Sequence, residues 1–267
     1  MKQLLQQTTL LLPVFTLLLL AACSQDPEDG LAGTEDVGQA IGTVTEVPDF
    51  AAIKDVKAKK KAFFDFMRPI VLSENAKVAK SRERLLAIAA QLKQNKTLSG
   101  NDTKWLAFIA NKYRVDMPTI KDEKAWELLK LRIDTVPFRL ALAQSANESS
   151  WGTSRFVKQG RNFFGEWCFS PGCGIVPLKR SKGLTHEVSS FETVNESVAS
   201  YLRNINRVDM YKPLRLVRQE MREEGKKPTA HKLAAGLIGY SERREAYVDE
   251  IRSMIKHNFD LMAGPPQ

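Results

Sequence analysis

The chain has 267 residues and carries 40 Lys and Arg against 31 Asp and Glu, a formal net charge of +9. This length can bury a substantial core, and the positive balance suits anionic neighbours such as nucleic acid, anionic lipid or the acidic groups of a cell wall. Many of the cations are mixed with acids, as at residues 81–84 and 241–245. Such mixing is typical of solvated helix faces and argues against a dedicated binding patch in these segments.

The first 22 residues have the order of regions found in a secretory signal. Lys2 is followed by a mostly apolar stretch at residues 10–20, and then by the small residues Ala21 and Ala22. The apolar stretch is too short to span a bilayer as a helix. We therefore expect residues 1–22 to be a signal peptide that is removed on export, which also argues against nucleic acid as a partner.

Residues 20–23, Leu-Ala-Ala-Cys, resemble the lipobox of bacterial lipoproteins. The resemblance implies that Cys23 is acylated and becomes the mature amino terminus, so the membrane would be a partner through a lipid anchor. Ser24 follows the cysteine, and similarity to the sorting rule of didermal bacteria points to the outer membrane, facing the periplasm. We expect the protein to be anchored and not to span the membrane.

Residues 23–49 are rich in Gly, Thr, Asp and Glu and lack helical periodicity, so they are predicted to be a flexible tether. Beyond them the pattern is overwhelmingly helical. Residues 50–134 are predicted to be a helical N-terminal region, with apolar stripes at Leu85, Ile88, Ala89 and Leu92 and at Trp105, Phe108, Ile109 and Tyr113. A third stripe, near the carboxyl end, consists of Tyr247, Ile251, Met254, Ile255 and Phe259.

Pro118 and Pro137 are predicted to mark helix boundaries. Residues 137–146 are apolar or small on nearly every side, which favours a helix buried in the middle of the domain. That helix should end near Gly152, with Glu148 in its last turn. The negative end of the helix dipole, the nearby Trp151 and the edge of the dry core all disfavour a carboxylate, so we expect a raised pKa for Glu148. A carboxylic acid of this kind can protonate a departing sugar oxygen.

Residues 143–152, Ala-Gln-Ser-Ala-Asn-Glu-Ser-Ser-Trp-Gly, and residues 162–165, Asn-Phe-Phe-Gly, resemble the paired motifs of the flagellar and autolysin-type N-acetylglucosaminidases, most closely their Bax-like branch. Similarity extends over about residues 135–225, and Ser150 replaces a glycine of the motif. The resemblance implies a mainly α, lysozyme-like helical domain with a small β element beside a cleft. It also implies that Glu148 is the catalytic acid and that Tyr211 lines the cleft.

A two-carboxylate mechanism needs a second acid, and the family's Thr-Glu-Tyr-like stretch is absent from this chain. Glu187 is the nearest candidate, whereas Glu166 and Glu192 fit less well. The alternative is assistance by the substrate's own 2-acetamido oxygen, with Tyr211 orienting the sugar.

Residues near the acid are candidates for substrate binding. The competing interpretation is simple packing for the aromatic ones and hydrogen bonding within its own loop for Asn162. These candidates are Gln144, Trp151, Asn162, Phe164 and Trp167.

Cys168 and Cys173 flank a Pro-Gly turn, and in an oxidising compartment they are predicted to form a disulfide and not a metal site. A short strand or hairpin is expected at residues 185–191, among turn residues. After it, residues 193–196 resemble a capping box that begins a helix whose apolar stripe faces the core.

Taken together, residues 135–264 are predicted to be a glucosaminidase-like catalytic region that cleaves peptidoglycan glycan strands after N-acetylglucosamine, with no cofactor and no metal. The alternatives are a catalytically silent glycan-binding scaffold, a regulator of another envelope enzyme, and an enzyme that cleaves a different amino sugar polymer.

Overall fold

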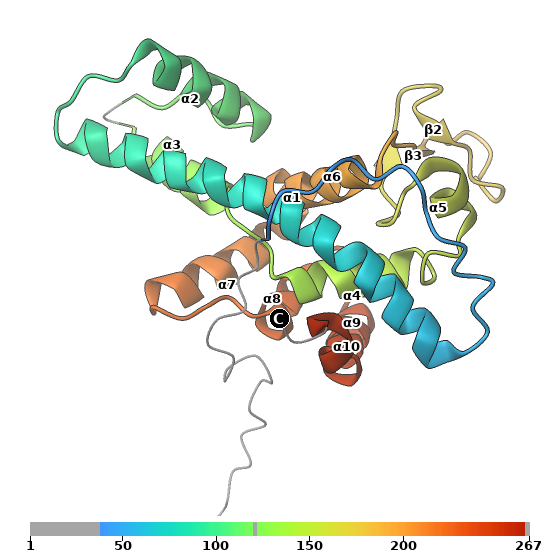
Figure 1. Ribbon diagram of the computed structural model, residues 1–267. Helices are drawn as coiled ribbons and strands as arrows, with labels where there is room; N and C mark the ends of the chain where they lie inside the picture. Colours follow the sequence, from blue (N-terminus) through green and yellow to red (C-terminus); the bar gives the residue numbers. More distant parts are fainter. Residues whose placement is uncertain (1–37, 120–121, 265–267) are drawn as a thin grey trace, which may run out of the picture.

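The computed structural model describes residues 38–119 and 122–264, so the predicted signal peptide and Cys23 lie outside the described residues. The described part is mainly helical with one small antiparallel sheet, as predicted (Figure 1). The α-helices are α1 (Val56–Lys93), α2 (Gly100–Lys112), α3 (Glu123–Arg132), α4 (Phe138–Glu148), α5 (Arg155–Gly160), α6 (Val194–Arg207), α7 (Lys212–Glu223), α8 (Ala230–Ala234), α9 (Glu245–His257) and α10 (Phe259–Ala263). Two 3₁₀ turns, η1 (Asp209–Tyr211) and η2 (Ala235–Leu237), complete the helical part. No helix among the described residues is long and apolar enough to cross a membrane.

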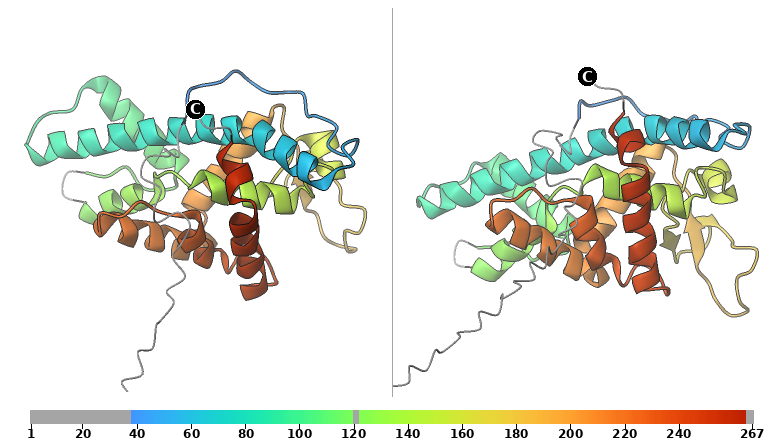
Figure 2. Two further views of the ribbon diagram at one scale, coloured as in Figure 1. Left: turned by 60° about the horizontal axis from the view of Figure 1, so that its bottom comes forward. Right: turned by 90° about the horizontal axis from the view of Figure 1, so that it is seen from below.

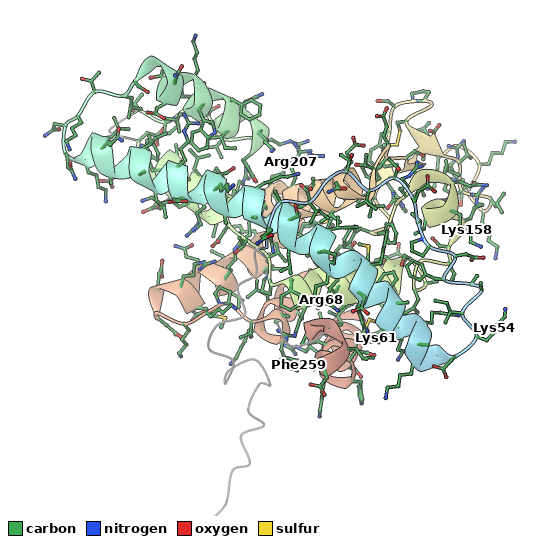
Figure 3. All side chains as sticks on the ribbon, viewed as in Figure 1. Lys54, Lys61, Arg68, Lys158, Arg207 and Phe259 are labelled. Atoms are coloured by element: carbon green, nitrogen blue, oxygen red, sulfur yellow. A yellow bond between two sulfur atoms is a disulfide. The ribbon has the colours of Figure 1, made fainter. Side chains whose placement is uncertain are left out.

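Helix α1 runs along the whole molecule, and the views in Figure 2 show it spanning from one end to the other. Asp55 caps its amino end by accepting a hydrogen bond from the backbone N–H of Ala58 at 2.7 Å. The first half of α1 packs against α4, α6 and α10. Arg68 fixes the contact with α10 by donating to the backbone carbonyl of Met262 at 2.8 Å (Figure 3).

The second half of α1 joins a separate apolar cluster. Leu85 and Ile88 of α1 pack there with residues of α2 and α3, including Ile109, Trp126 and Leu129. The two stripes predicted at residues 85–92 and 105–113 therefore lie on neighbouring helices of this second cluster, although Phe108 remains exposed. Figure 1 places α2 and α3 at the end of the molecule farther from the sheet.

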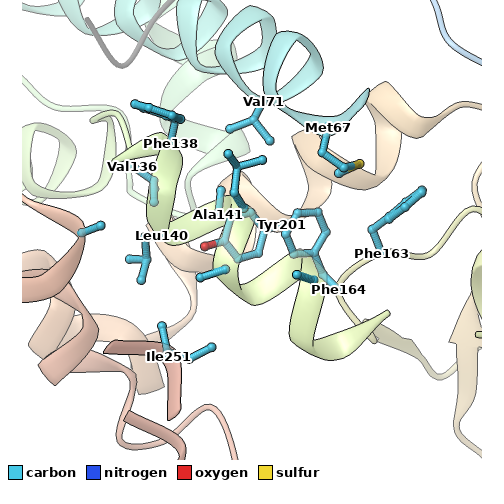
Figure 4. Packing of buried hydrophobic residues seen from close by; sticks show 14 of the residues in the cluster. Met67, Val71, Val136, Phe138, Leu140, Ala141, Phe163, Phe164, Tyr201 and Ile251 are labelled. Carbon is cyan, nitrogen blue, oxygen red and sulfur yellow. The ribbon is translucent and has the colours of Figure 1, made fainter. Parts of the chain in front are cut away.

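Helix α4 lies in the middle of the main core, as its composition predicted. Each residue from Phe138 to Ala146 is buried, and α1, α8, α9 and α10 surround the helix. Figure 4 shows Leu140 and Ala141 of α4 between Val71 of α1 and Ile251 of α9. The first half of α1, from the predicted N-terminal region, therefore shares this core with helices of the predicted catalytic region.

The sheet has the order β1-β3-β2, formed by β1 (Trp167–Cys168), β3 (Glu187–Ser189) and β2 (Gly174–Ile175). β3 is the strand expected within residues 185–191, and both partners pair with it in antiparallel register. After the sheet, the Thr193 hydroxyl accepts from the N–H of Glu196 at 3.1 Å, and this cap begins α6 as predicted.

Residues 38–49 differ from the flexible tether that the composition predicted, because they are held along the domain. Val44 accepts a hydrogen bond from the N–H of Val194 at 2.8 Å and donates its own N–H to Asn195 at the same distance. Gly38 donates to the carbonyl of Leu72 at 3.1 Å. The partners of these contacts lie far away in sequence, so the local residue pattern does not predict them. The segment leads to Phe50, which is buried in the main core.

Candidate active site

Glu148 is the last residue of α4, at the edge of the main core. The helix ends there because Ser150, Trp151 and Gly152 adopt positive φ angles of 51°, 59° and 76°. The N–H of Trp151 donates to the carbonyl of Ala146 at 2.8 Å, which closes the turn. The buried helix and this tight turn thus hold the Glu148 carboxyl group where the core meets the surface.

The Glu148 carboxyl group accepts its closest hydrogen bond from the phenol of Tyr247, which reaches Oε1 at 2.8 Å from α9. The side chain of Asn147 makes a longer contact of 3.4 Å with the same oxygen. Burial raises the pKa of Glu148, and the hydrogen bonds from Tyr247 and Asn147 oppose that rise. The net direction is upward, as expected, and its largest cause is desolvation by burial.

A directed chain of hydrogen bonds lies behind the carboxyl group. The phenol of Tyr201 donates to Oε1 of Gln144 at 2.7 Å, and Nε2 of Gln144 donates to the Tyr247 oxygen at 3.0 Å. Each donor therefore points towards Glu148. Gln144 was predicted to bind substrate, but its side chain has no exposed surface and both ends of its amide are occupied. Its place in the structure is to orient Tyr247.

Three tyrosine rings line up beside the acid. Tyr240 stacks on Tyr247 with ring centroids 5.2 Å apart, and its other neighbour is Tyr211 at 5.7 Å. Burial, together with the charges of Glu166 and Glu148, raises the pKa of Tyr211 to about 12. Tyr211 therefore lies within electrostatic range of both carboxyl groups, consistent with a position near the site. Its raised pKa keeps the phenol protonated at neutral pH.

The Asn-Phe-Phe-Gly motif is buried where the sequence suggested substrate contacts. Asn162 is 1% exposed, and its amide N–H₂ donates to the carbonyls of Glu166 and Ser189, both at 2.9 Å. Phe164 is 2% exposed and stacks on Tyr201 at 4.0 Å (Figure 4). Both residues shape the turn at residues 162–166 from inside and present almost no surface to a ligand in this structure.

The two tryptophans near the motifs differ in exposure. Trp151 packs its ring against Phe63 and Phe64 of α1, at 5.7 and 5.3 Å, which is a packing role. Trp167 is 59% exposed and stacks on His186 at 4.1 Å. Of the two, Trp167 is the one that presents a flat ring to solvent.

Cys168 and Cys173 form the predicted disulfide, with a Cα–Cα distance of 6.2 Å. Glu187, the predicted second acid, begins β3 beside the loop that the disulfide closes, and it accepts from the N–H groups of Gly172 at 3.1 Å and Gly174 at 2.8 Å. These backbone hydrogen bonds lower its pKa. The sulfurs and the carboxylate lie within 4.8 Å of one another, but the sulfurs are bonded to each other and the carboxylate already has donors.

Glu166 lies in the same turn as the motif and is connected to α6. Its Oε2 accepts from the hydroxyl of Ser200 at 2.8 Å and from the amide of Asn204 at 2.6 Å. Gly165, beside it, approaches the acid so closely that a Cβ at this position would lie 3.8 Å from Oε2 of Glu148. Burial raises the pKa of Glu166 to about 7, against the opposing effects of Ser200 and the two arginines Arg203 and Arg207.

Sequence reasoning did not identify Tyr247 and Tyr240 as site residues. Tyr247 belongs to the apolar stripe near the carboxyl end, and the same stripe correctly predicted that its ring is buried. Its hydroxyl meets a carboxyl group 99 residues earlier in the chain, and no local spacing encodes that contact.

Comparison with known proteins adds two findings. Residues 124–260 match the glucosaminidase family model, described as mannosyl-glycoprotein endo-beta-N-acetylglucosaminidase. Protein bax of Escherichia coli (strain K12) is 28% identical over 220 residues, which cover 82% of this chain and 77% of that protein. No solved structure matches.

Proposed function

Because this chain belongs to the glucosaminidase family, we propose that it hydrolyses the glycan strands of peptidoglycan, cleaving after N-acetylglucosamine. The observation that carries the proposal is the position of Glu148, a half-buried carboxyl group with a raised pKa at the end of a buried helix. A raised pKa favours the protonated form, which fits the role of a general acid.

In the proposed reaction, Glu148 gives its proton to the glycosidic oxygen while the bond from that oxygen to the anomeric carbon breaks. A water molecule then supplies the hydroxyl group at the anomeric carbon and returns a proton. The directed chain through Tyr247 supports the carboxylate that remains after proton transfer, because the phenol is already placed as its donor. No cofactor takes part in this step.

The neighbours of Glu148 suit a sugar polymer. Tyr211 offers a protonated phenol near the acid, which can orient a sugar by hydrogen bonding. Trp167 offers an exposed ring on which a sugar face can stack. The chain's net charge of +9 also suits the acidic peptide and phosphate groups of a cell wall.

The test compares the purified wild-type protein with Glu148→Gln on purified peptidoglycan. Glutamine keeps the volume of the side chain and can still accept from Tyr247, but it cannot donate a proton, so soluble products should fall by about 10²- to 10⁴-fold. Mass analysis of the new reducing ends should identify N-acetylglucosamine. Glu192→Gln is the matched control, because Glu192 is exposed and precedes the cap of α6.

Retention of near wild-type turnover by Glu148→Gln would overturn the assignment of the acid. Binding of glycan by a wild-type protein that releases no product would instead favour the silent scaffold.

A further inference from the structure

The two oxygens of the Glu166 carboxyl group have contrasting surroundings. Oε2 accepts two hydrogen bonds from α6, donated by Ser200 and Asn204. Oε1 is buried and has no hydrogen-bond partner among the described residues. An ionised carboxylate spreads its charge over both oxygens, so ionisation would leave half of that charge in a buried place without a donor. A proton on Oε1 removes the charge and leaves both contacts of Oε2 intact.

This carboxyl group connects two parts of the site. The turn at residues 162–166 carries Gly165, where an added Cβ would be in van der Waals contact with Glu148, and Phe164, whose carbonyl accepts from the Tyr240 phenol at 2.9 Å. Tyr240 in turn stacks on Tyr247, the donor to Glu148. The bonds from Glu166 to Ser200 and Asn204 fix this turn to α6, so Glu166 is linked to Glu148 through packed and hydrogen-bonded groups.

The charges around Glu166 come from several elements. Arg203 and Arg207 of α6 favour its ionised form, and Arg207 lies at the end of α6 farther from the sheet (Figure 3). Tyr211 of η1 and Tyr201 of α6 each have a pKa that is raised by the charges of Glu166 and Glu148. Desolvation outweighs the arginines, and the resulting pKa of Glu166 is about 7.

We propose that Glu166 is a positioning residue of the glycan-cleaving site. Its neutral form holds the turn at residues 162–166 against α6, in the arrangement that keeps Glu148 in its active position. Ionisation places an unpartnered charge on Oε1 and loosens the turn by drawing in water or another donor. The inference rests on the proposed hydrolase activity, and it gives Glu166 a part distinct from that of a second catalytic acid.

The experiment compares the wild-type protein with Glu166→Gln across pH 5 to 9. Glutamine stays neutral and its carbonyl can accept from both Ser200 and Asn204. At pH 6 its glycan-cleaving rate should lie within about 3-fold of wild type. At pH 8.5, about 1.5 units above the pKa of Glu166, the variant should exceed wild type by about 10- to 30-fold, because only the wild-type residue has ionised.

A second measurement does not depend on activity. The pKa of Glu166 rises from 4.5 to about 7 on folding, so its contribution to stability is complete below pH 4.5 and is lost as pH rises to 7. The urea midpoint of wild type should therefore fall between pH 5 and pH 8 by more than that of Glu166→Gln. Ser200→Ala removes one donor to Oε2, which should raise the pKa of Glu166. In this variant the fall of the urea midpoint should therefore extend to higher pH than in wild type.

Glu192→Gln is the exposed control and should reproduce the wild-type profiles. A loss of 10²-fold or more in Glu166→Gln at every pH would overturn the proposal in favour of direct catalysis by Glu166. Identical pH profiles of activity and urea midpoint for Glu166→Gln and wild type would overturn it as well. If the wild-type protein cleaves no glycan, the proposed function fails, while the urea measurements still decide whether Glu166 is held in its neutral form.

Discussion

The phenol of Tyr247 donates a 2.8 Å hydrogen bond to Oε1 of Glu148, joining α9 to the end of α4. The same phenol accepts from Gln144, so its own proton is directed to Glu148. This bond favours the ionised form of Glu148, whereas burial favours the neutral form. The balance between the two sets the pH at which the acid loses its proton.

Tyr247→Phe should move the alkaline decline of activity to higher pH. The variant removes the main donor to the carboxylate, so the pKa of Glu148 rises further and the acid form persists longer as pH increases. It also leaves the buried amide of Gln144 without an acceptor, which should lower the free energy of unfolding by about 1–2 kcal/mol. Initial rates of glycan release between pH 5 and pH 9 measure the first effect, and urea unfolding measures the second.

Tyr201→Phe is the matched control for this prediction. It breaks the chain at its far end and leaves the bond from Tyr247 to Glu148 in place, so the decline should move much less. A shift of equal size in both variants, or a shift of Tyr247→Phe to lower pH, would contradict the role assigned to the phenol.

Substitutions at two positions of the turn after α4 should have opposite effects on stability. Ser150→Gly should stabilise the protein by about 0.5–1 kcal/mol, because the lower cost of a φ of 51° for glycine outweighs its greater freedom in the unfolded chain. Gly152→Ala should destabilise it strongly, since the new Cβ would lie 2.4 Å from the ring of Phe50. Melting temperatures of the two variants test this pair, and a stabilised Gly152→Ala would show that the turn is wrongly placed.

Removal of the disulfide should cost little stability and more activity. A bridge across five positions contributes about 2 kcal/mol through the unfolded state. Its loop, however, holds Glu187 and precedes β2, while Trp167 lies beside Cys168. We expect a double Cys168→Ser/Cys173→Ser variant to lower the rate of glycan cleavage markedly while lowering the melting temperature only slightly. An unchanged rate on peptidoglycan would show that the loop is irrelevant to the site.

Glu187→Gln is the companion variant for the same loop. An amide is uncharged and accepts only through its oxygen, so one of the two backbone N–H groups that donate to Glu187 loses its acceptor and the other keeps only a neutral one. The loss of activity should resemble that of the double cysteine variant and stay well below that of Glu148→Gln. A loss as large as that of Glu148→Gln would restore Glu187 as the second acid.

The lipid anchor is tested independently of the fold. Cys23→Ser should abolish incorporation of labelled palmitate and leave the purified domain as active as the wild-type domain, since Cys23 lies outside the described residues that form the site. Fractionation should find the wild-type mature protein in the outer membrane. Recovery of that protein from the cytoplasm would contradict both the export signal and the anchor.

The sequence predicted the parts of this molecule that have local causes. The run of small and apolar residues at 138–146 predicted a buried helix, and the polar residues after it predicted that Glu148 lies at the helix end. The turn between Cys168 and Cys173 predicted their disulfide, and Thr193 predicted the start of α6. In each case, the residues that determine the structure lie within a few positions of it.

The features that the sequence did not determine depend on contacts between distant segments. Gln144, Asn162 and Phe164 stand in motifs, and motifs reveal residue type and order but not exposure, so the sequence could not show that these side chains are buried. Val44 and the rest of residues 38–49 pair with backbone and side chains far along the chain. The unusual state of Glu166 arises from burial against α6, which composition near residue 166 does not reveal.

Helix α1 belongs to both apolar clusters, which has a consequence for how the protein unfolds. Phe63 and Phe64 are buried in one cluster and Leu85 and Ile88 in the other, on a single uninterrupted helix. Melting of either cluster would strip one half of that helix of its packing, and helices of this kind depend on packing more than on intrinsic propensity. Calorimetry should therefore record one heat-absorption peak with matching van't Hoff and calorimetric enthalpies, and a fragment lacking α2 and α3 should expose the apolar face of α1 and aggregate.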